Sequence, residues 1–240
     1  MAHPLRPGSL EHRQLREAVV KNGLESDPFV CLEVRPRAYG LNVALGWPLP
    51  SSLRENYLSL AAKLEALSPD LYVYRYSQTH VTVMTLVNFK LHVEPGQAER
   101  TSTDSLARHV AQTMRRLHQS WRPFVLDFTT VVMSRQAVFI PIGDEAGGVE
   151  RIRKDIVTAL EGDDLAMELQ VSPAVHSTVA RFRRVPSELV SFLRSFDEIA
   201  LETNLGAVTV DEIVLTAETK PYMEEGHVID RFSLSGNNKQ

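Results

Sequence analysis

Two short stretches of the sequence have the same form, His80-Val81-Thr82-Val83 and His176-Ser177-Thr178-Val179. Each reads His-x-Thr-Val. Each also lies in a run rich in β-branched and apolar residues, 79–86 in the first half of the chain and 174–182 in the second. Such runs favour β-strands. We therefore expect two strands that each begin with a histidine and a threonine, as a duplicated half-domain would give.

The phase of the alternation predicts what each strand exposes. Successive side chains of a strand point to opposite faces. The His and the Thr of each copy therefore share a face, and strict alternation adds Met84 to that face in the first copy and Ala180 in the second. The valines lie on the opposite face, which suits a core. Arg181 has the wrong parity to point with His176, so we leave it out of the predicted site.

A third match, His118-Gln119-Ser120, lies at the end of a helical stretch and is followed by Trp121. We interpret it as a chance match. A single strand histidine beside a threonine is more often a hydrogen-bonded structural residue than a catalyst. Two copies that share the threonine, the following valine and the strand phase favour a paired site.

Two imidazoles that face one another across a cleft suit acid–base chemistry. Imidazole titrates near pH 6.5, so one ring can act as neutral base while the other is the charged acid. Thr82 and Thr178 can donate hydrogen bonds to phosphate oxygens and hold the phosphorus between the rings. This arrangement suits in-line attack on a phosphodiester without a metal. We expect His80 and His176 on adjacent strands and a bell-shaped pH profile that straddles neutrality.

Composition narrows the class of protein. The chain has 240 residues, 43% hydrophobic and 23% charged, with a net charge of −4, as in an ordinary soluble globular protein. No global basic field would attract DNA or other long nucleic acid, although a local site could hold a small anion. The single Cys31 excludes an internal disulfide and a Cys-rich metal site. We find no signal peptide or membrane-length apolar run and expect a cytoplasmic protein; its oligomeric state stays open.

The order of elements predicts an α+β fold with antiparallel sheets. Residues 1–37 form a leader with a helix over 9–21 and no catalytic role, residues 38–235 form the main domain, and residues 236–240 form a loose tail. We expect the strand over 71–76 to pair as a hairpin with the first His-x-Thr strand. The other predicted elements are strands at 38–46, 124–133, 137–142, 205–215 and 228–234, helices at 53–67, 105–120, 149–161 and 187–196, and a loop at 90–103.

Several tyrosines are candidates for substrate contact. Tyr72, Tyr74 and Tyr76 fall on one face of the predicted 71–76 strand. This ladder fits ordinary sheet packing, and it also fits a wall on which a base could stack, for which Tyr74 and Tyr76 are candidates. Tyr222 lies in the turn of the final predicted hairpin, where loops often line a site.

The two tetrapeptides resemble the paired His-x-Ser/Thr-x motifs of the 2H phosphoesterase superfamily. That superfamily includes RNA 2′,3′-cyclic phosphodiesterases, also called 2′-5′ RNA ligase-like proteins. The resemblance covers roughly residues 38–235. It implies a bilobal, pseudo-twofold α+β fold with helices outside and both motif strands facing a central cleft. It also implies that His80 and His176 are the acid–base pair and that Thr82 and Thr178 contact the phosphate, with no metal and no cofactor.

The resemblance further implies a cyclic phosphodiesterase that acts on a small phosphodiester, a cyclic nucleotide or an RNA end. It favours His176 as the base that activates the nucleophile and His80 as the acid that protonates the leaving oxygen. Ligation of RNA ends is an alternative, because it uses the same groups in reverse. A binding module without turnover is a second alternative, and a His-based metal site is weak for lack of nearby acidic or Cys ligands.

Overall fold

The computed structural model describes residues 10–161, 169–172 and 174–234 of the chain. The helices are α1 (Leu10–Asn22), α2 (Pro28–Cys31), α3 (Arg54–Leu67), α4 (Gln97–Leu117), α5 (Gly148–Leu160) and α6 (Leu189–Glu202). The strands are β1 (Gly40–Leu45), β2 (Leu71–Val73), β3 (Val81–Val87), β4 (Phe124–Phe128), β5 (Val132–Met133), β6 (Ala137–Gly143), β7 (His176–Phe182), β8 (Gly206–Val210), β9 (Glu212–Glu218) and β10 (Gly226–Ser233). Short 3₁₀ turns include η2 (Tyr76–Gln78), η3 (Phe89–Leu91), η4 (His118–Ser120) and η6 (Pro221–Met223).

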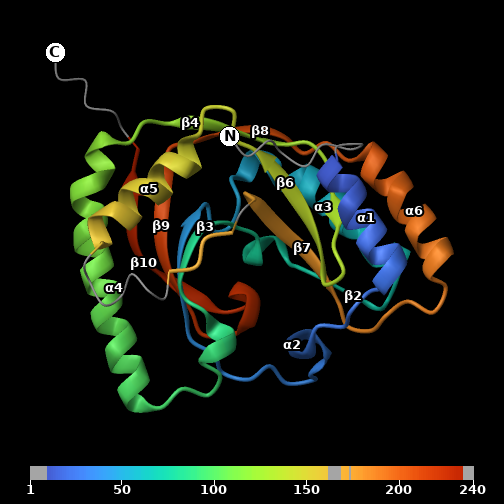
Figure 1. The fold of residues 1–240 in the computed structure, drawn as a ribbon, viewed down its shortest axis with the longest axis horizontal. Coiled ribbons are helices and arrows are strands. Elements are labelled where there is room, and N and C mark those ends of the chain that lie inside the picture. The colour runs from blue at the N-terminus through green and yellow to red at the C-terminus, as the bar shows by residue number, and fades with distance from the viewer. Residues whose placement is uncertain (1–9, 162–168, 173, 235–240) are drawn as a thin grey trace.

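The strands form two sheets, and every described pairing is antiparallel, which confirms the predicted α+β class. One sheet has four strands in the order β10-β9-β1-β3, and the other runs β2-β7-β6-β4-β8 with β5 paired to β6. Helices α4 and α5 flank the four-stranded sheet, and α1, α3 and α6 lie together beside the other (Figure 1). Each sheet carries one His-x-Thr motif: His80 immediately precedes β3, and His176 begins β7.

The predicted hairpin of the tyrosine strand with the first motif strand is wrong. Strand β2 pairs with β7 of the six-stranded sheet, whereas β3 belongs to the four-stranded sheet. The cause lies between them, where η2 turns the chain and the buried Gln78 side chain accepts a hydrogen bond from Arg75 N at 2.9 Å. The turn ends the strand after Val73, so the two segments leave it into different sheets.

Several predicted boundaries also change. The loop at 90–103 is shorter, because helix α4 begins at Gln97 in a run of good helix formers after Pro95-Gly96. The strand at 124–133 is two strands, and Thr130, which lies between them, donates a hydrogen bond to the carbonyl of Ala200 at 3.0 Å. The strand at 205–215 divides at Asp211 into β8, paired with β4, and β9, paired with β10 and β1. Helix α6 begins two residues late, without a side-chain cap from Ser187, and continues to Glu202.

The N-terminal segment packs onto the rest of the molecule. Val19 of α1 and Leu24 are buried in the main hydrophobic core. Residues 28–31 form the short helix α2, because Asp27 accepts a hydrogen bond from Phe29 N and caps it. The predicted tail, 236–240, lies outside the described residues. In the described part of the chain, no helix is long and apolar enough to cross a membrane.

Candidate active site

A cavity of about 320 Å³ lies between the two sheets and collects both motifs. Its lining comes from the four-stranded sheet, from β7 and from segments beside these strands: Asn42, Tyr74, His80, Thr82, Thr85, Asn88, Phe89, Lys90, Gln170, Val171, Ser172, His176, Thr178, Arg181, Glu218, Tyr222 and Met223. His80 and His176 therefore face one cavity. The sequence predicted that the two histidines lie on adjacent strands. In the structure they are not on neighbouring strands of one sheet, because β3 and β7 belong to different sheets.

The two histidines are held in the same way. The ring nitrogen Nδ1 of His80 lies 2.8 Å from the carbonyl oxygen of Gln78, and Nδ1 of His176 lies 3.0 Å from that of Ala174. Each carbonyl belongs to the residue two positions earlier. A carbonyl oxygen can only accept, so Nδ1 carries the proton and Nε2 is the nitrogen that can exchange a proton with a ligand. Both imidazoles thus have the same tautomer, set by their own backbone.

Burial lowers the pKa of both rings. At His80 the removal of water outweighs the hydrogen bond to Gln78, and the nearby His176 lowers the pKa further. At His176 burial again dominates, the bond to Ala174 opposes it, and the charges of Arg181 and Arg153 add to the lowering. Without a bound anion, both rings therefore favour the neutral form at neutral pH.

A β-bulge in β7 changes the set of side chains that face the cavity. In the pairing with β6, Thr178 lies opposite Phe139 and Ala180 opposite Val138, so Val179 has no partner. The extra residue shifts the alternation by one. Ala180, predicted to point with His176, is fully buried, and Arg181 lines the cavity instead. The adjacent apolar pair Val179-Ala180, which interrupts the alternation, is the sequence signal for this bulge.

Strand β3 carries the same irregularity. Its pairing with β1 skips Val83 and, further along, Leu86. Met84, predicted to share the face of His80, is therefore fully buried, whereas Thr85 faces the cavity. In both motif strands the cavity receives the His, the Thr two positions on and a further polar residue five positions on from the His.

The backbone carbonyls of the bulge residues Val83 and Val179 accept hydrogen bonds from groups outside the strand pairs β1–β3 and β6–β7. Arg153 of α5, 4% exposed, donates from Nε to the carbonyl of Val83 at 2.8 Å. The backbone N–H of Tyr74 donates to the carbonyl of Val179 at 2.8 Å. Since an unpaired buried carbonyl costs about 1–3 kcal/mol, these donors stabilise the bulges that shape the cavity.

Arg181 is held by side chains from three other segments. Its Nε donates to the hydroxyl of Tyr74 at 2.9 Å, and its Nη1 forms an ion pair with Asp27 at 3.0 Å. Its guanidinium carbon lies 4.1 Å from the centre of the Tyr222 ring, and the Tyr222 hydroxyl donates to the same Asp27 oxygen. Asp27 belongs to the leader that the sequence left without a role. No short-range pattern links it to the motifs, because its contact depends on how the leader packs.

Two of the three candidate tyrosines line the cavity, and one does not. Tyr74 and Tyr222 face it, with ring centres 6.0 Å apart. Tyr76, predicted as a possible substrate contact, lies away from it, because η2 rotates it toward α3. There its hydroxyl donates to the carbonyls of Leu49 and Pro50.

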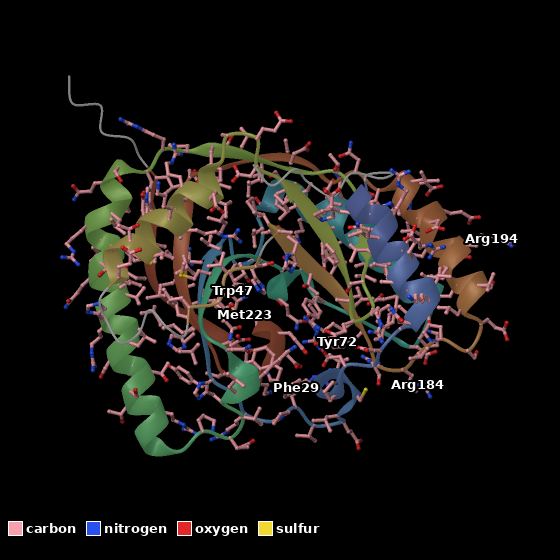
Figure 2. The ribbon with its side chains drawn as sticks, viewed as in Figure 1. Phe29, Trp47, Tyr72, Arg184, Arg194 and Met223 are labelled. Carbon is pink, nitrogen blue, oxygen red and sulfur yellow. The ribbon has the colours of Figure 1, made fainter. Side chains whose placement is uncertain are left out.

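Near this cluster, the aromatic side chains of Phe29 and Tyr72 pack against Tyr74 and Tyr222. Figure 2 shows these two residues and Met223 around the same central region, on α2, β2 and η6. Side chains from α2 and β2 thus pack against the two tyrosines that line the cavity.

Glu218, which the sequence did not single out, is a buried carboxyl in the cavity wall. It accepts hydrogen bonds from Asn42 Nδ2 and Met223 N, each at 3.0 Å. Burial outweighs these bonds and raises its pKa to about 7. Gly40 lies across from it on β1, and a Cβ at that position would overlap the Glu218 carboxyl, so the close approach requires glycine.

The third His-x-Ser stretch takes no part in this cavity. His118 lies on η4, its Nδ1 is 3.2 Å from the carbonyl of Met114, and it is absent from the lining. Within residues 10–161, 169–172 and 174–234, no group of three or more His, Cys, Asp or Glu side chains is arranged to hold a metal ion.

Solved structures share this architecture. The chain aligns with TT0787 of Thermus thermophilus at a TM-score of 0.55 and 19% identity, over 82% of this chain and 98% of that one. It aligns with LigT of E. coli, crystallised with 3′-AMP, at a TM-score of 0.50 and 13% identity, over 84% and 99% of the two chains. A conserved protein of unknown function from Agrobacterium tumefaciens aligns at a TM-score of 0.57 and 12% identity, over 91% and 99%.

No protein-family model matches the sequence, and no curated protein sequence matches it. At identities this low, the structural likeness establishes the fold. The chain therefore has the fold of these structures, which include TT0787, LigT and a protein described as a phosphoesterase.

Proposed function

We propose that the protein is a metal-independent phosphodiesterase that hydrolyses 2′,3′-cyclic phosphates of nucleotides or RNA ends. The observation that carries this proposal is the matched presentation of two imidazoles, each with Nδ1 bonded to its own backbone and each followed by a threonine in the same cavity. The fold, shared with LigT, whose structure was determined with the nucleotide 3′-AMP, supports it.

In the proposed reaction, Nε2 of His176 takes a proton from water as the water oxygen bonds to phosphorus. The bond from phosphorus to one ribose oxygen breaks, and Nε2 of His80 gives its proton to that oxygen. Thr82 and Thr178 donate hydrogen bonds to the two phosphate oxygens that do not react. The product is a phosphate monoester with a free neighbouring hydroxyl, and transfer of a proton between the two rings through solvent restores the starting state.

The test is a substrate panel of 2′,3′-cyclic nucleotides, RNA with a cyclic phosphate end and linear diesters, each with EDTA present. We expect hydrolysis of the cyclic substrates at a rate that EDTA does not change. His118→Ala, which alters the chance motif outside the cavity, is the matched control and should retain full activity. Activity that disappears with EDTA and returns with a divalent ion would contradict the two-histidine mechanism, and binding without turnover would favour a binding module.

A further inference from the structure

Two cations approach one aromatic ring at the end of the cavity that Tyr222 lines. The guanidinium carbon of Arg181 lies 4.1 Å from the centre of the Tyr222 ring, and Lys90 Nζ lies 6.0 Å from it. Both cations line the cavity that holds His80 and His176. His176 and Arg181 are five residues apart on β7 at roughly 3.3 Å per residue, so the backbone of Arg181 lies well away from the place that the proposed function assigns to the reacting phosphate.

The charges at this end do not balance. Asp27 pairs with Arg181 and its charge also acts on Lys90, but it is already engaged by Arg181, by the Tyr222 hydroxyl and by Phe29 N. Lys90 Nζ forms no hydrogen bond or ion pair with any described residue. Burial and the charge of Arg181 lower the pKa of Lys90, and Asp27 only partly opposes them. One positive charge therefore faces the cavity without an anionic partner.

The backbone that carries Lys90 is fixed although its ammonium group is not. Lys90 N donates to the side chain of Asn88 at 3.1 Å, which caps η3. The preceding residue, Phe89, is buried and packs edge-on against Tyr222, with ring centres 5.0 Å apart. The lysine is thus anchored at its Cα and can move its charged end toward a ligand.

We propose that Lys90, with Arg181 and Tyr222, forms a second anion subsite, which binds a phosphate of the substrate other than the one held between the histidines. This inference rests on the proposed function and narrows its substrate class to cyclic phosphates that carry a further phosphate. That phosphate is either the terminal 5′-phosphate of a mononucleotide or the internucleotide phosphate of an RNA end. Lysine and arginine supply the charge and hydrogen-bond donors that both kinds of phosphate need.

Three substrates with the same base separate these sources: a nucleoside 2′,3′-cyclic phosphate with a 5′-hydroxyl, the same compound with a 5′-phosphate, and a dinucleotide that ends in the same cyclic phosphate. We expect at least one phosphate-bearing substrate to have a KM about tenfold below that of the 5′-hydroxyl compound, as one charge-assisted hydrogen bond predicts. Whichever of them shows the advantage identifies the source. Lys90→Met should bring the ratio of the two KM values toward one. Lys63→Met, which removes an exposed lysine paired with Glu202 on the outer surface, should leave the ratio unchanged.

Equal KM values for all three substrates with the wild-type protein would overturn the subsite, and so would a Lys90→Met variant that keeps the wild-type ratio. Failure of the proposed function gives a different result, namely no hydrolysis of any cyclic phosphate. In that case calorimetric titration with the same three compounds decides. Tighter binding of a phosphate-bearing compound, lost in Lys90→Met, supports the subsite without catalysis, and equal binding refutes it.

Discussion

His176 and Arg181 line the same cavity although five positions separate them on one strand. Regular alternation would place them on opposite faces, and the unpaired Val179 between them reverses the parity. The bulge thereby brings a guanidinium and an imidazole to one surface, where the positive charge of Arg181 lowers the pKa of His176. The electrostatics of the proposed base thus depend on one extra residue in a strand.

The two histidines should differ in their response to the leaving group. His80→Ala and His176→Ala should each lower kcat/KM on a cyclic nucleotide by about 10²–10⁴, the usual contribution of one acid or base. A diester with a leaving group that needs no proton should restore turnover in His80→Ala and leave His176→Ala slow. Rescue of His176→Ala alone would reverse the two roles. Full activity in both variants would refute the hypothesis that these histidines act as acid and base.

The pH optimum of kcat/KM should lie below 6.5. This parameter reports the free enzyme, in which one ring must be neutral and the other protonated, so the optimum falls between their pKa values. Burial lowers the pKa of both rings from 6.5. The maximum of kcat/KM is therefore expected at a lower pH than the sequence predicted, since that prediction was a profile straddling neutrality.

In the dependence of kcat/KM on pH, the limb that reports the ionisation of His176 should move to higher pH in Arg181→Met. The variant removes a positive charge that lowers the pKa of this ring. Profiles of kcat/KM for both proteins, measured at constant ionic strength, provide the check. A wild-type optimum above pH 7 would show that burial does not control these groups.

The threonines should contribute less than the histidines. Thr82→Val and Thr178→Val keep the side-chain shape and remove one hydrogen bond to a charged phosphate, which is worth about 1.5–3 kcal/mol, or roughly ten- to hundredfold in kcat/KM. Thr209→Val, on the exposed side of β8 and outside the cavity, is the matched control. Steady-state kinetics on one cyclic nucleotide should separate the two cavity variants from the control, and identical values for all three would contradict a role in phosphate contact.

Asp27 should stabilise the fold through Arg181. Asp27→Asn keeps the size of the side chain but leaves the largely buried Arg181 guanidinium, whose side chain is 15% exposed, without its counter-charge. The free energy of unfolding should therefore fall by up to about 3–5 kcal/mol. Asp70→Asn removes the acid of an ion pair whose arginine is exposed, Arg184, and should cost less than about 1 kcal/mol.

Urea denaturation of the Asp27 and Asp70 variants measures both effects. The double variant Asp27→Asn with Arg181→Met should regain part of the lost stability, because it no longer buries an unpaired charge. Equal losses in Asp27→Asn and Asp70→Asn would show that the buried pair has no special weight.

The sequence by itself determined the class of fold and the histidine–threonine pairs that share the cavity. Alternation holds over the first three residues of each motif, so His80 with Thr82 and His176 with Thr178 were placed correctly on common faces. Apolar runs of strand and helix length, with few long loops, were enough for an α+β fold with antiparallel sheets. These features depend on neighbours close in the chain, which short-range patterns record.

Only the tertiary structure decided which other residues join the site. The bulges that replace Met84 with Thr85 and Ala180 with Arg181 arise from the register against β1 and β6, which no local pattern fixes. The pairing of β2 with β7 and the removal of Tyr76 from the cavity follow from the turn at η2. Asp27 reaches Arg181, and Lys90 reaches the cavity, from segments outside the motifs. Their contacts exist only once the two sheets have packed, because burial and charge balance are properties of the assembled core.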